Sequence, residues 1–305
     1  MLFCLPYNEV VVKEELFVEL GYDPSRDKLL ILHADDVGMC HSVNQATFER
    51  LTDGSVSSAS IMVPCPWVLE AAEFFRGGEF DVGVHSTLTS EWKWYKWRPL
   101  TRASGLVGKG GFMWSDVRSL ALHATAQEVR EELEAQVRWA LDYGLKVSHL
   151  DTHMGAVYVR ADFLKEYLEV AVKHGLLPMI PRPTKRLIEA ATRQGLPVDQ
   201  LKPLMKQAPL QLDLLVPGLP PRGLDAKRRF LLAVISELEP GTISQVIVHL
   251  GLDTYELKAI MGAGYRSRYH EYLLVADGEV RKAMDERSVH LIGWRDLAEA
   301  LEKGS

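Results

Sequence analysis

The chain has 305 residues, of which 47% are hydrophobic and 25% are charged, and this composition is typical of a folded globular protein rather than a disordered one. Its formal net charge is −6 and no basic run stands out, which disfavours a nucleic acid as partner. The three cysteines, Cys4, Cys40 and Cys65, lack the spacing of a metal site or a C-x-x-C motif. We interpret them as buried or incidental thiols in a reducing compartment.

The first 22 residues begin with apolar side chains and soon become acidic. They lack the basic segment and the small-residue cleavage site of a signal peptide. No apolar run approaches the ~18 residues that a transmembrane helix needs. We therefore expect a cytoplasmic protein that does not use a membrane.

Short runs with strand character alternate along the chain with longer helical segments. The predicted strands cover residues 28–36, 55–63, 81–89, 147–153, 177–183, 211–217, 244–250 and 288–294. The predicted amphipathic helices cover residues 126–144, 162–174, 225–238 and 294–302. In the first of these helices Val129, Leu133 and Val137 recur at helical spacing, and Gly144 supplies the stop.

Strands that alternate with helices predict an α/β fold with a parallel sheet. At this length a single-domain (β/α)-barrel variant is the first choice, and an open doubly wound sheet is the second. No linker, internal repeat or low-complexity segment interrupts the chain, so we predict one domain over residues 1–305. Two stretches, 90–114 and 251–272, show no regular pattern, and long loops in barrels usually form the mouth of the active site.

Residues that can carry chemistry fall where the predicted strands end, which is where the functional residues of α/β barrels lie. Two acids end the first strand, and histidines or an arginine lie toward the ends of four others. These residues are Asp35, Asp36, His85, Asp151, His153, Arg182 and His249.

Taken singly, each of these residues has an ordinary structural explanation. An Asp-Asp pair after a strand often caps a helix or a turn. A histidine such as His85 can be a core residue bonded to a carbonyl group. The string "HLDTH" is less ordinary, because strand alternation places His149, Asp151 and His153 on one face.

Taken together, the residues fit a divalent cation held by one carboxylate and two imidazoles, with positions left open for water. A cation also explains the acid pair, because it removes the repulsion between neighbouring carboxylates. One acid would then be a ligand, and the other would stay free as a base.

Five strings in this order, "HADDVGMCHSVNQA", "GVHSTLTSEW", "SHLDTHMG", "MIPRP" and "VIVHLG", resemble the YdjC-like family, which includes chitooligosaccharide deacetylases and hopanoid-pathway deacetylases. The resemblance runs from about residue 28 to residue 272. It implies a (β/α)-barrel variant related to polysaccharide deacetylases. It also implies a hydrolase that removes acetyl groups from N-acetylated sugars with the help of a metal.

The resemblance implies roles for the matching positions. Asp36, His85 and His153 would bind the metal. Asp35 would be the general base, Arg182 would orient or charge-balance that base, and His249 would be the general acid. Two imidazoles and a carboxylate favour Zn²⁺, whereas Mg²⁺, which prefers oxygen ligands, is the second possibility.

Aromatic and basic residues of the two irregular stretches are candidates for substrate contact. Trp92, Trp94 and Trp97 alternate with charged residues, and aromatic faces commonly bind sugar rings. These rings could instead cover the end of the barrel or a subunit interface, and a homodimer is possible. Arg266 and Arg268 could line the site or only cap a helix.

Two alternative functions remain open. The first is a metal-dependent hydrolase of another amide or of a phosphoester, although no Gly-rich phosphate loop is evident. The second is a non-catalytic carbohydrate-binding protein. The presence of both acids and both histidines argues against the second alternative.

Overall fold

The computed structural model describes residues 9–303 and contains a parallel sheet of eight strands. Every predicted strand is confirmed, mostly within shorter bounds. The strands are β1 Lys28–Val37, β2 Ser58–Ile61, β3 Val82–Ser86, β4 Val147–Thr152, β5 Leu177–Pro178, β6 Leu214–Val216, β7 Ile243–Val248 and β8 Val289–Leu291.

The strand order along the sheet is β5-β4-β3-β2-β1-β7-β6, and β8 pairs separately with the first residues of β1. The chain just after β5 meets the chain just before β6 through one parallel bridge, Pro181 to Leu212. The amide of Arg182 donates to the carbonyl of Leu212 at 2.8 Å across this contact. The sheet therefore curls toward closure. The predicted barrel variant is confirmed, and the open doubly wound sheet is excluded.

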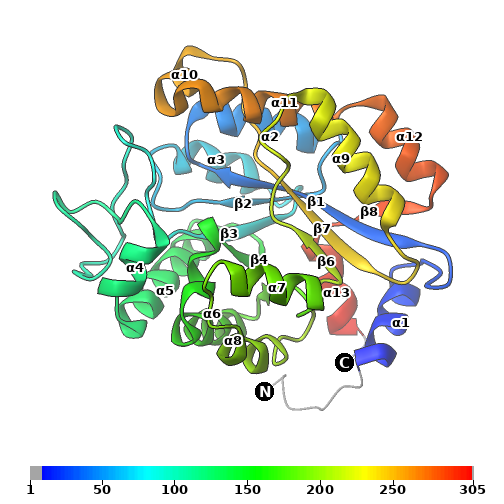
Figure 1. Cartoon of the computed structure of the whole chain (residues 1–305), viewed down its shortest axis with the longest axis horizontal. Helices are drawn as coiled ribbons and strands as arrows, with labels where there is room; N and C mark the ends of the chain where they lie inside the picture. Colours follow the sequence, from blue (N-terminus) through cyan, green and yellow to red (C-terminus); the bar gives the residue numbers. More distant parts are fainter. Residues whose placement is uncertain (1–8, 304–305) are drawn as a thin grey trace.

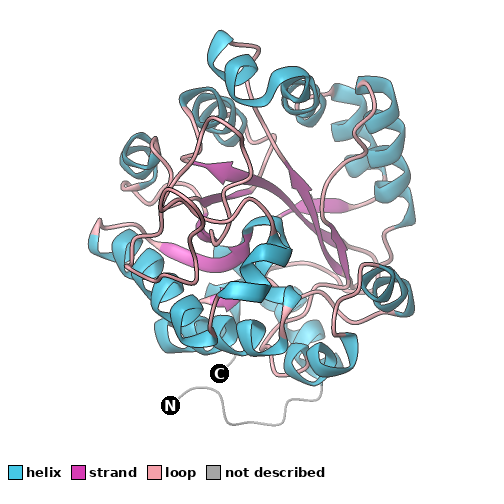
Figure 2. Cartoon of the chain, turned by 60° about the vertical axis from the view of Figure 1, so that its left-hand side comes forward, coloured by secondary structure: helices cyan, strands magenta, loops and turns pink. Residues whose placement is uncertain are grey.

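Helices accompany the curled sheet, most of them on its outer side (Figures 1 and 2). They are α1 Glu9–Glu19, α2 His41–Thr52, α3 Val68–Phe75, α4 Val117–His123, α5 Ala126–Asp142, α6 Ala161–His174, α7 Lys185–Arg193, α8 Val198–Met205, α9 Leu224–Glu237, α10 Tyr255–Met261, α11 Tyr265–Val275, α12 Gly278–Glu286 and α13 Trp294–Lys303. Short 3₁₀ segments cover His153–Val159 and Gly262–Gly264.

The four predicted amphipathic helices correspond to α5, α6, α9 and α13. One expectation was wrong, because residues 251–272 are not an irregular loop but contain α10 and most of α11. Residues 90–114 are a long irregular segment as expected, with one antiparallel bridge between Val107 and Met113.

Strand alternation separates two sides of the sheet. The outward residues of β1, such as Leu30 and Leu32, pack in the large core beneath the helices. The inward residues Leu29 and Ile31 form a second cluster inside the curl, to which α13 adds Trp294. Further along the same inward face, the side chains become polar. The interior of the curled sheet is thus apolar near the start of β1 and polar near the end of β1.

No helix within residues 9–303 is both long enough and apolar enough to cross a bilayer. Cys40 and Cys65 are buried free thiols, as the sequence predicts, and Cys4 lies outside the described residues.

Candidate metal centre

The acid pair lies in an irregular part of β1. Pairing with β2 is regular as far as Ala34 and resumes at Val37 with a shifted register. Asp36 has a φ of +66°, in the left-handed region that a residue with a side chain rarely adopts. Neighbouring side chains of a regular strand face opposite sides, but here Asp35 and Asp36 both approach His85. The irregularity therefore directs both carboxylates into the same interior.

Three side chains from three strand ends converge on one point. Asp36 Oδ1 lies 3.3 Å from His85 Nε2 and 3.2 Å from His153 Nδ1. All three residues are at least 95% buried. A carboxylate oxygen and two imidazole nitrogens in this arrangement form a facial set of ligands that could hold a divalent cation.

Both histidines are held by a carboxylate through their other nitrogen. Asp151 Oδ1 lies 2.8 Å from His85 Nδ1, and Glu91 Oε2 lies 2.9 Å from His153 Nε2. Such partners fix the tautomer and the orientation of a ligating imidazole. The nitrogens that face Asp36 are therefore the ones left free for a cation.

The electrostatics of the cluster also favour a cation. Burial alone would raise the pKa of Asp36, but the guanidinium of Arg268 and the two histidines hold that pKa well below its usual range. Burial alone would lower the pKa of His153, but Glu91 and Asp36 outweigh it and raise the pKa to about 9. The pKa of His85 is raised well above its usual value, because Asp151 and Asp35 outweigh its burial. The site therefore attracts positive charge, which protons or a metal ion can supply.

The environment of one buried atom, Asp36 Oδ1, indicates that these residues suit a metal. Asp36 Oδ1 has no hydrogen-bond partner among the described residues, although it is buried between two imidazole nitrogens. Two further groups of possible ligands both include Asp151. The oxygens of Asp151 already accept bonds from His33, Ser60 and His85. The group formed by Asp36, His85 and His153 is therefore the best candidate.

The side chains of Asp35 and His249 lie beside this centre. Asp35 Oδ2 is 3.8 Å from His85 Nε2 and 4.0 Å from His249 Nε2. His33 Nε2 approaches Asp35 Oδ1 at 3.2 Å from below. The side chain of His249, just after β7, is about one third exposed, so it borders solvent while Asp35 is buried. Asp35 and His249 thus lie next to the triad, and His249 is the one of the two that reaches solvent.

The comparisons with known proteins agree with this architecture. The family model described as YdjC-like protein matches residues 29–286. This chain belongs to the YdjC-like family. The resemblance that the sequence motifs indicated is therefore confirmed.

Among the YdjC-like relatives, a carbohydrate deacetylase of Thermus thermophilus is 33% identical over 292 residues, which cover 94% of this chain and 99% of the relative. A chitooligosaccharide deacetylase of Yersinia enterocolitica is 34% identical over 131 residues, which cover 42% of this chain and 49% of the relative. A crystal structure of an Enterococcus faecalis protein, described as a candidate cellobiose-phosphate cleavage protein, shares the fold with a TM-score of 0.72 and 23% identity. That alignment covers 89% of this chain and 99% of the other.

Not every residue singled out from the sequence reaches the centre of this YdjC-like chain. Arg182 forms an ion pair with Asp213 at 3.1 Å, and no hydrogen bond or ion pair joins it to Asp35 among the described residues. The arginine that reaches the acid pair is Arg268 on α11, whose Nη2 contacts Asp36 Oδ2. Arg266 lies on the exposed side of the same helix.

The three tryptophans of the 90–114 segment have different environments. Trp97 is 2% exposed, and its ring lies 6.2 Å from that of His153 with the edge directed toward it. Trp92 is partly buried and its Nε1 has no partner among the described residues. Trp94 is 84% exposed. Contact with a substrate stays a prediction for Trp92 and Trp97.

Sequence reasoning missed Glu91 as a contributor to the centre, and it named Arg268 only as a residue that could line the site or cap a helix. Glu91 lies in an irregular loop, and Arg268 is remote along the chain from the acid that it contacts. The sequence offered one indication of their role, since both are charged residues in stretches that were expected to border the site.

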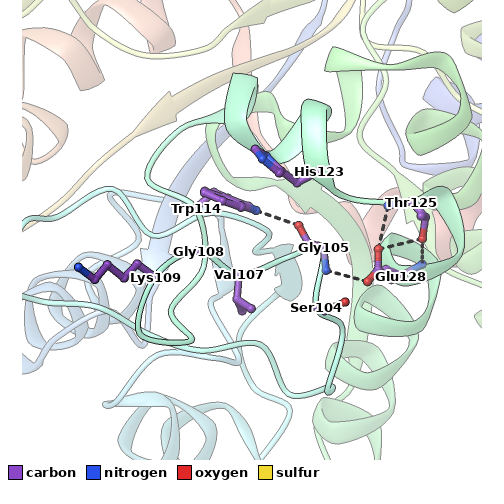
Figure 3. Close-up of a pocket in the computed structure, with 9 residues that line it drawn as sticks. All are labelled: Ser104, Gly105, Val107, Gly108, Lys109, Trp114, His123, Thr125 and Glu128. Atoms are coloured by element: carbon purple, nitrogen blue, oxygen red, sulfur yellow. Dashed lines mark hydrogen bonds between the residues drawn. The ribbon is translucent and has the colours of Figure 1, made fainter.

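A hollow lined by the 90–114 segment, α4 and the start of α5 (Figure 3) shares no lining residue with the metal centre. Trp114 Nε1 donates to the carbonyl of Gly105, and the Gly105 amide donates to Glu128. One face of the Trp114 ring is stacked on His123 at 4.2 Å. A side chain at Gly108 would come within 2.9 Å of the same ring. The indole nitrogen and one face of the Trp114 ring are thus already engaged within the protein.

Proposed function

We propose that this chain is a metal-dependent hydrolase that removes acetyl groups from N-acetylated sugars or oligosaccharides. The observation that carries the proposal is the convergence of Asp36 Oδ1, His85 Nε2 and His153 Nδ1 beside the free carboxylate of Asp35. The names of the Thermus thermophilus and Yersinia enterocolitica relatives support the choice of an acetylated carbohydrate as substrate.

A divalent cation held by these three residues would polarise the acetyl carbonyl and make water a better nucleophile. Asp35 is placed to accept a proton from that water, because it is not needed as a ligand and lies next to the triad. The new C–O bond then forms at the acetyl carbon. His33 contributes by holding Asp35 Oδ1 from the interior side.

Breaking the C–N bond requires a proton on the departing nitrogen. His249 is the candidate donor, since its Nε2 lies 4.0 Å from Asp35 on the more exposed side of the site. Its backbone amide donates to Glu271 at 2.7 Å, which fixes the chain at the end of β7. The products are acetate and an amino sugar, and the proton taken by Asp35 balances the one that His249 delivers.

The test is an acetate-release assay over N-acetylated monosaccharides and oligosaccharides with added Zn²⁺, Co²⁺ or Mg²⁺. We expect metal-dependent acetate release. Asp35→Asn should retain bound metal in an elemental assay while turnover falls by about 10²- to 10⁴-fold, because it removes only the base.

Asp36→Ala is the complementary variant and should lose the bound metal together with activity. Full metal occupancy in Asp36→Ala would contradict the ligand assignment. Glycan binding without any acetate release, unchanged in Asp35→Asn, would instead favour a carbohydrate-binding protein. Zinc as the metal, a cytoplasmic location and a homodimer stay predictions.

A further inference from the structure

The Arg268 side chain is unusual among the arginines of this chain. Its residue is 5% exposed, and one terminal nitrogen, Nη2, contacts Asp36 Oδ2. The other two nitrogens, Nε and Nη1, are buried without a hydrogen-bond partner among the described residues. Buried polar groups nearly always find a partner, so two free donors on one guanidinium require an explanation.

Covalent geometry places these donors at the metal centre. A guanidinium is planar, and Nη1 and the Nε–H lie on the two sides of Nη2. Since Nη2 touches a metal ligand, the free donors lie next to that ligand. The carboxylate of Glu91, which holds His153, also acts on the charge of Arg268, so the guanidinium lies near this partner of the second histidine ligand.

The backbone is shaped to admit this side chain. A Cβ at Gly251 would come within 3.2 Å of Arg268 Cβ and 2.6 Å of Leu257 Cδ2. Glycine after β7 therefore leaves the passage through which the stem of Arg268 reaches Asp36. The opposite carboxylate oxygen, Asp36 Oδ1, stays free for a cation.

We propose that Arg268 uses its free donors to bind the acyl oxygen of the substrate, and afterwards the acetate product, beside the cation. This inference rests on the proposed deacetylase function. Preorganised donors at an oxygen that becomes negative lower the barrier, because they need no reorganisation during the reaction. A charged donor also holds an anionic product more tightly than a neutral one.

The competing explanation is that Arg268 only neutralises Asp36. Arg268→Lys separates the two, because lysine keeps a positive charge near Asp36 but has no planar fork. We expect kcat for acetate release to fall by about 100-fold with bound Zn²⁺ unchanged, as for loss of one donor to an oxyanion. We expect the Kd of acetate for the zinc-loaded protein to rise by about 10-fold or more.

Arg281→Lys is the matched control, since Arg281 is exposed on α12 and its side chain donates, among the described residues, only to the carbonyl of Gly54 at 3.4 Å. It should change neither kcat nor the Kd of acetate. An unchanged kcat and Kd in Arg268→Lys would overturn the inference. Loss of zinc with no change in acetate affinity per loaded site would also overturn it, in favour of charge neutralisation.

A second measurement covers the case in which Arg268→Lys does not fold. A crystal structure of the natural chain with Zn²⁺ and acetate should show an acetate oxygen within hydrogen-bond distance of Arg268 Nη1 or Nε. Acetate bound elsewhere, or on the cation away from Arg268, would contradict the inference. If the natural chain binds acetate through Arg268 but releases none from any acetylated sugar, the proposed function fails while this assignment stands.

Discussion

Asp36 has two carboxylate oxygens with opposite neighbours. Oδ2 faces the guanidinium of Arg268, whereas Oδ1 faces two imidazole nitrogens and has no hydrogen-bond partner among the described residues. This division explains how one carboxylate can contact a buried cation of the protein and still offer an oxygen to a metal. It also distinguishes the two acids, because no ion pair with an arginine is found for Asp35 among residues 9–303.

Glu91 allows a test of how firmly a ligand must be held. Its carboxylate accepts from His153 Nε2 at 2.9 Å, while Nδ1 faces Asp36. Glu91→Ala removes this acceptor, and we expect the Kd of Zn²⁺ to rise by about 10- to 100-fold, as for other lost partners of ligating histidines. Competition with a chromophoric chelator measures the Kd of Zn²⁺ in both proteins.

Glu91→Gln is the matched control for that experiment. Its amide oxygen can still accept from His153, so the Kd of Zn²⁺ should change by about threefold or less. Equal losses in the two variants would show that the charge of Glu91, and not its bond to the imidazole, is what the site needs.

Sequence patterns singled out the residues of the triad, among other residues at strand ends, because strand ends are local properties, whereas the family resemblance implied their roles as ligands. Asp36, His85 and His153 each follow a hydrophobic run, and parallel strands bring such ends together. Arg182 follows the same rule, but its strand lies at the seam of the sheet, where Asp213 is the nearer partner. Which ends meet depends on strand order, and the pattern does not contain that information.

Helix α11 was missed for a physical reason. Helix prediction relies on a stripe of apolar residues, but the buried side of α11 carries Arg268 and Glu271 as well as Leu274. These charged residues are buried because each has a partner on another element. A helix that delivers charges to a site thus resembles an irregular loop in the sequence.

The attachment of α11 to α9 gives a prediction at the level of elements. Lys227 on α9 is fully buried, and its Nζ lies 2.6 Å from Glu271 Oε1. Lys227→Met leaves the Glu271 carboxylate buried without its cation, and we expect the free energy of unfolding to fall by about 3–5 kcal/mol. Denaturant unfolding followed by tryptophan fluorescence measures the change.

The control is Lys282→Met, which removes a lysine paired with Glu286 at 3.7 Å when both side chains are mostly exposed. Exposed pairs contribute little, so this variant should lose less than about 1 kcal/mol. The argument fails if the two lysine variants are equally stable.

At the scale of the molecule, the curl of the sheet encloses a continuous polar interior below the metal centre. It joins side chains of five strands and α13. They are His33, Ser58, Ser60, His85, His149, Asp151, Gln245 and Trp294. Strand alternation turns the strand residues inward, and the curl of the sheet brings His33 on β1 within 3.1 Å of Asp151 on β4.

His149 in this interior gives the molecule a predictable dependence on pH. Ser148 Oγ donates to the Asp81 carboxylate at 2.6 Å and so accepts from His149 Nδ1, which leaves Nε2 buried without a partner in the described part of the chain. The His149 ring lies so close to Gly83 that a Cβ there would come within 2.4 Å of Nε2. Burial therefore lowers the pKa of His149 to about 4, from 6.5 in an unfolded chain.

Because the folded pKa is the lower one, the unfolded chain binds more protons between pH 6.5 and about 4. The stability that neutral His149 provides is complete above pH 6.5 and is lost as the pH falls through this range. Each pKa unit corresponds to about 1.4 kcal/mol, so the loss is about 3 kcal/mol. Denaturant unfolding of the metal-free protein across this range should show the decline, and His149→Gln should reduce its slope.

His33→Asn is the informative comparison, because the pKa of His33 is raised by folding whereas that of His149 is lowered. Burial lowers the pKa of His33, but Asp151 and Asp35 outweigh it and raise the pKa to about 9. Its contribution is therefore complete below pH 6.5 and is lost as the pH rises toward 9, so His33→Asn should flatten the alkaline side of the stability curve. If the free energy of unfolding falls equally steeply with decreasing pH in His149→Gln and in the natural chain, the carboxylates and not His149 cause the fall.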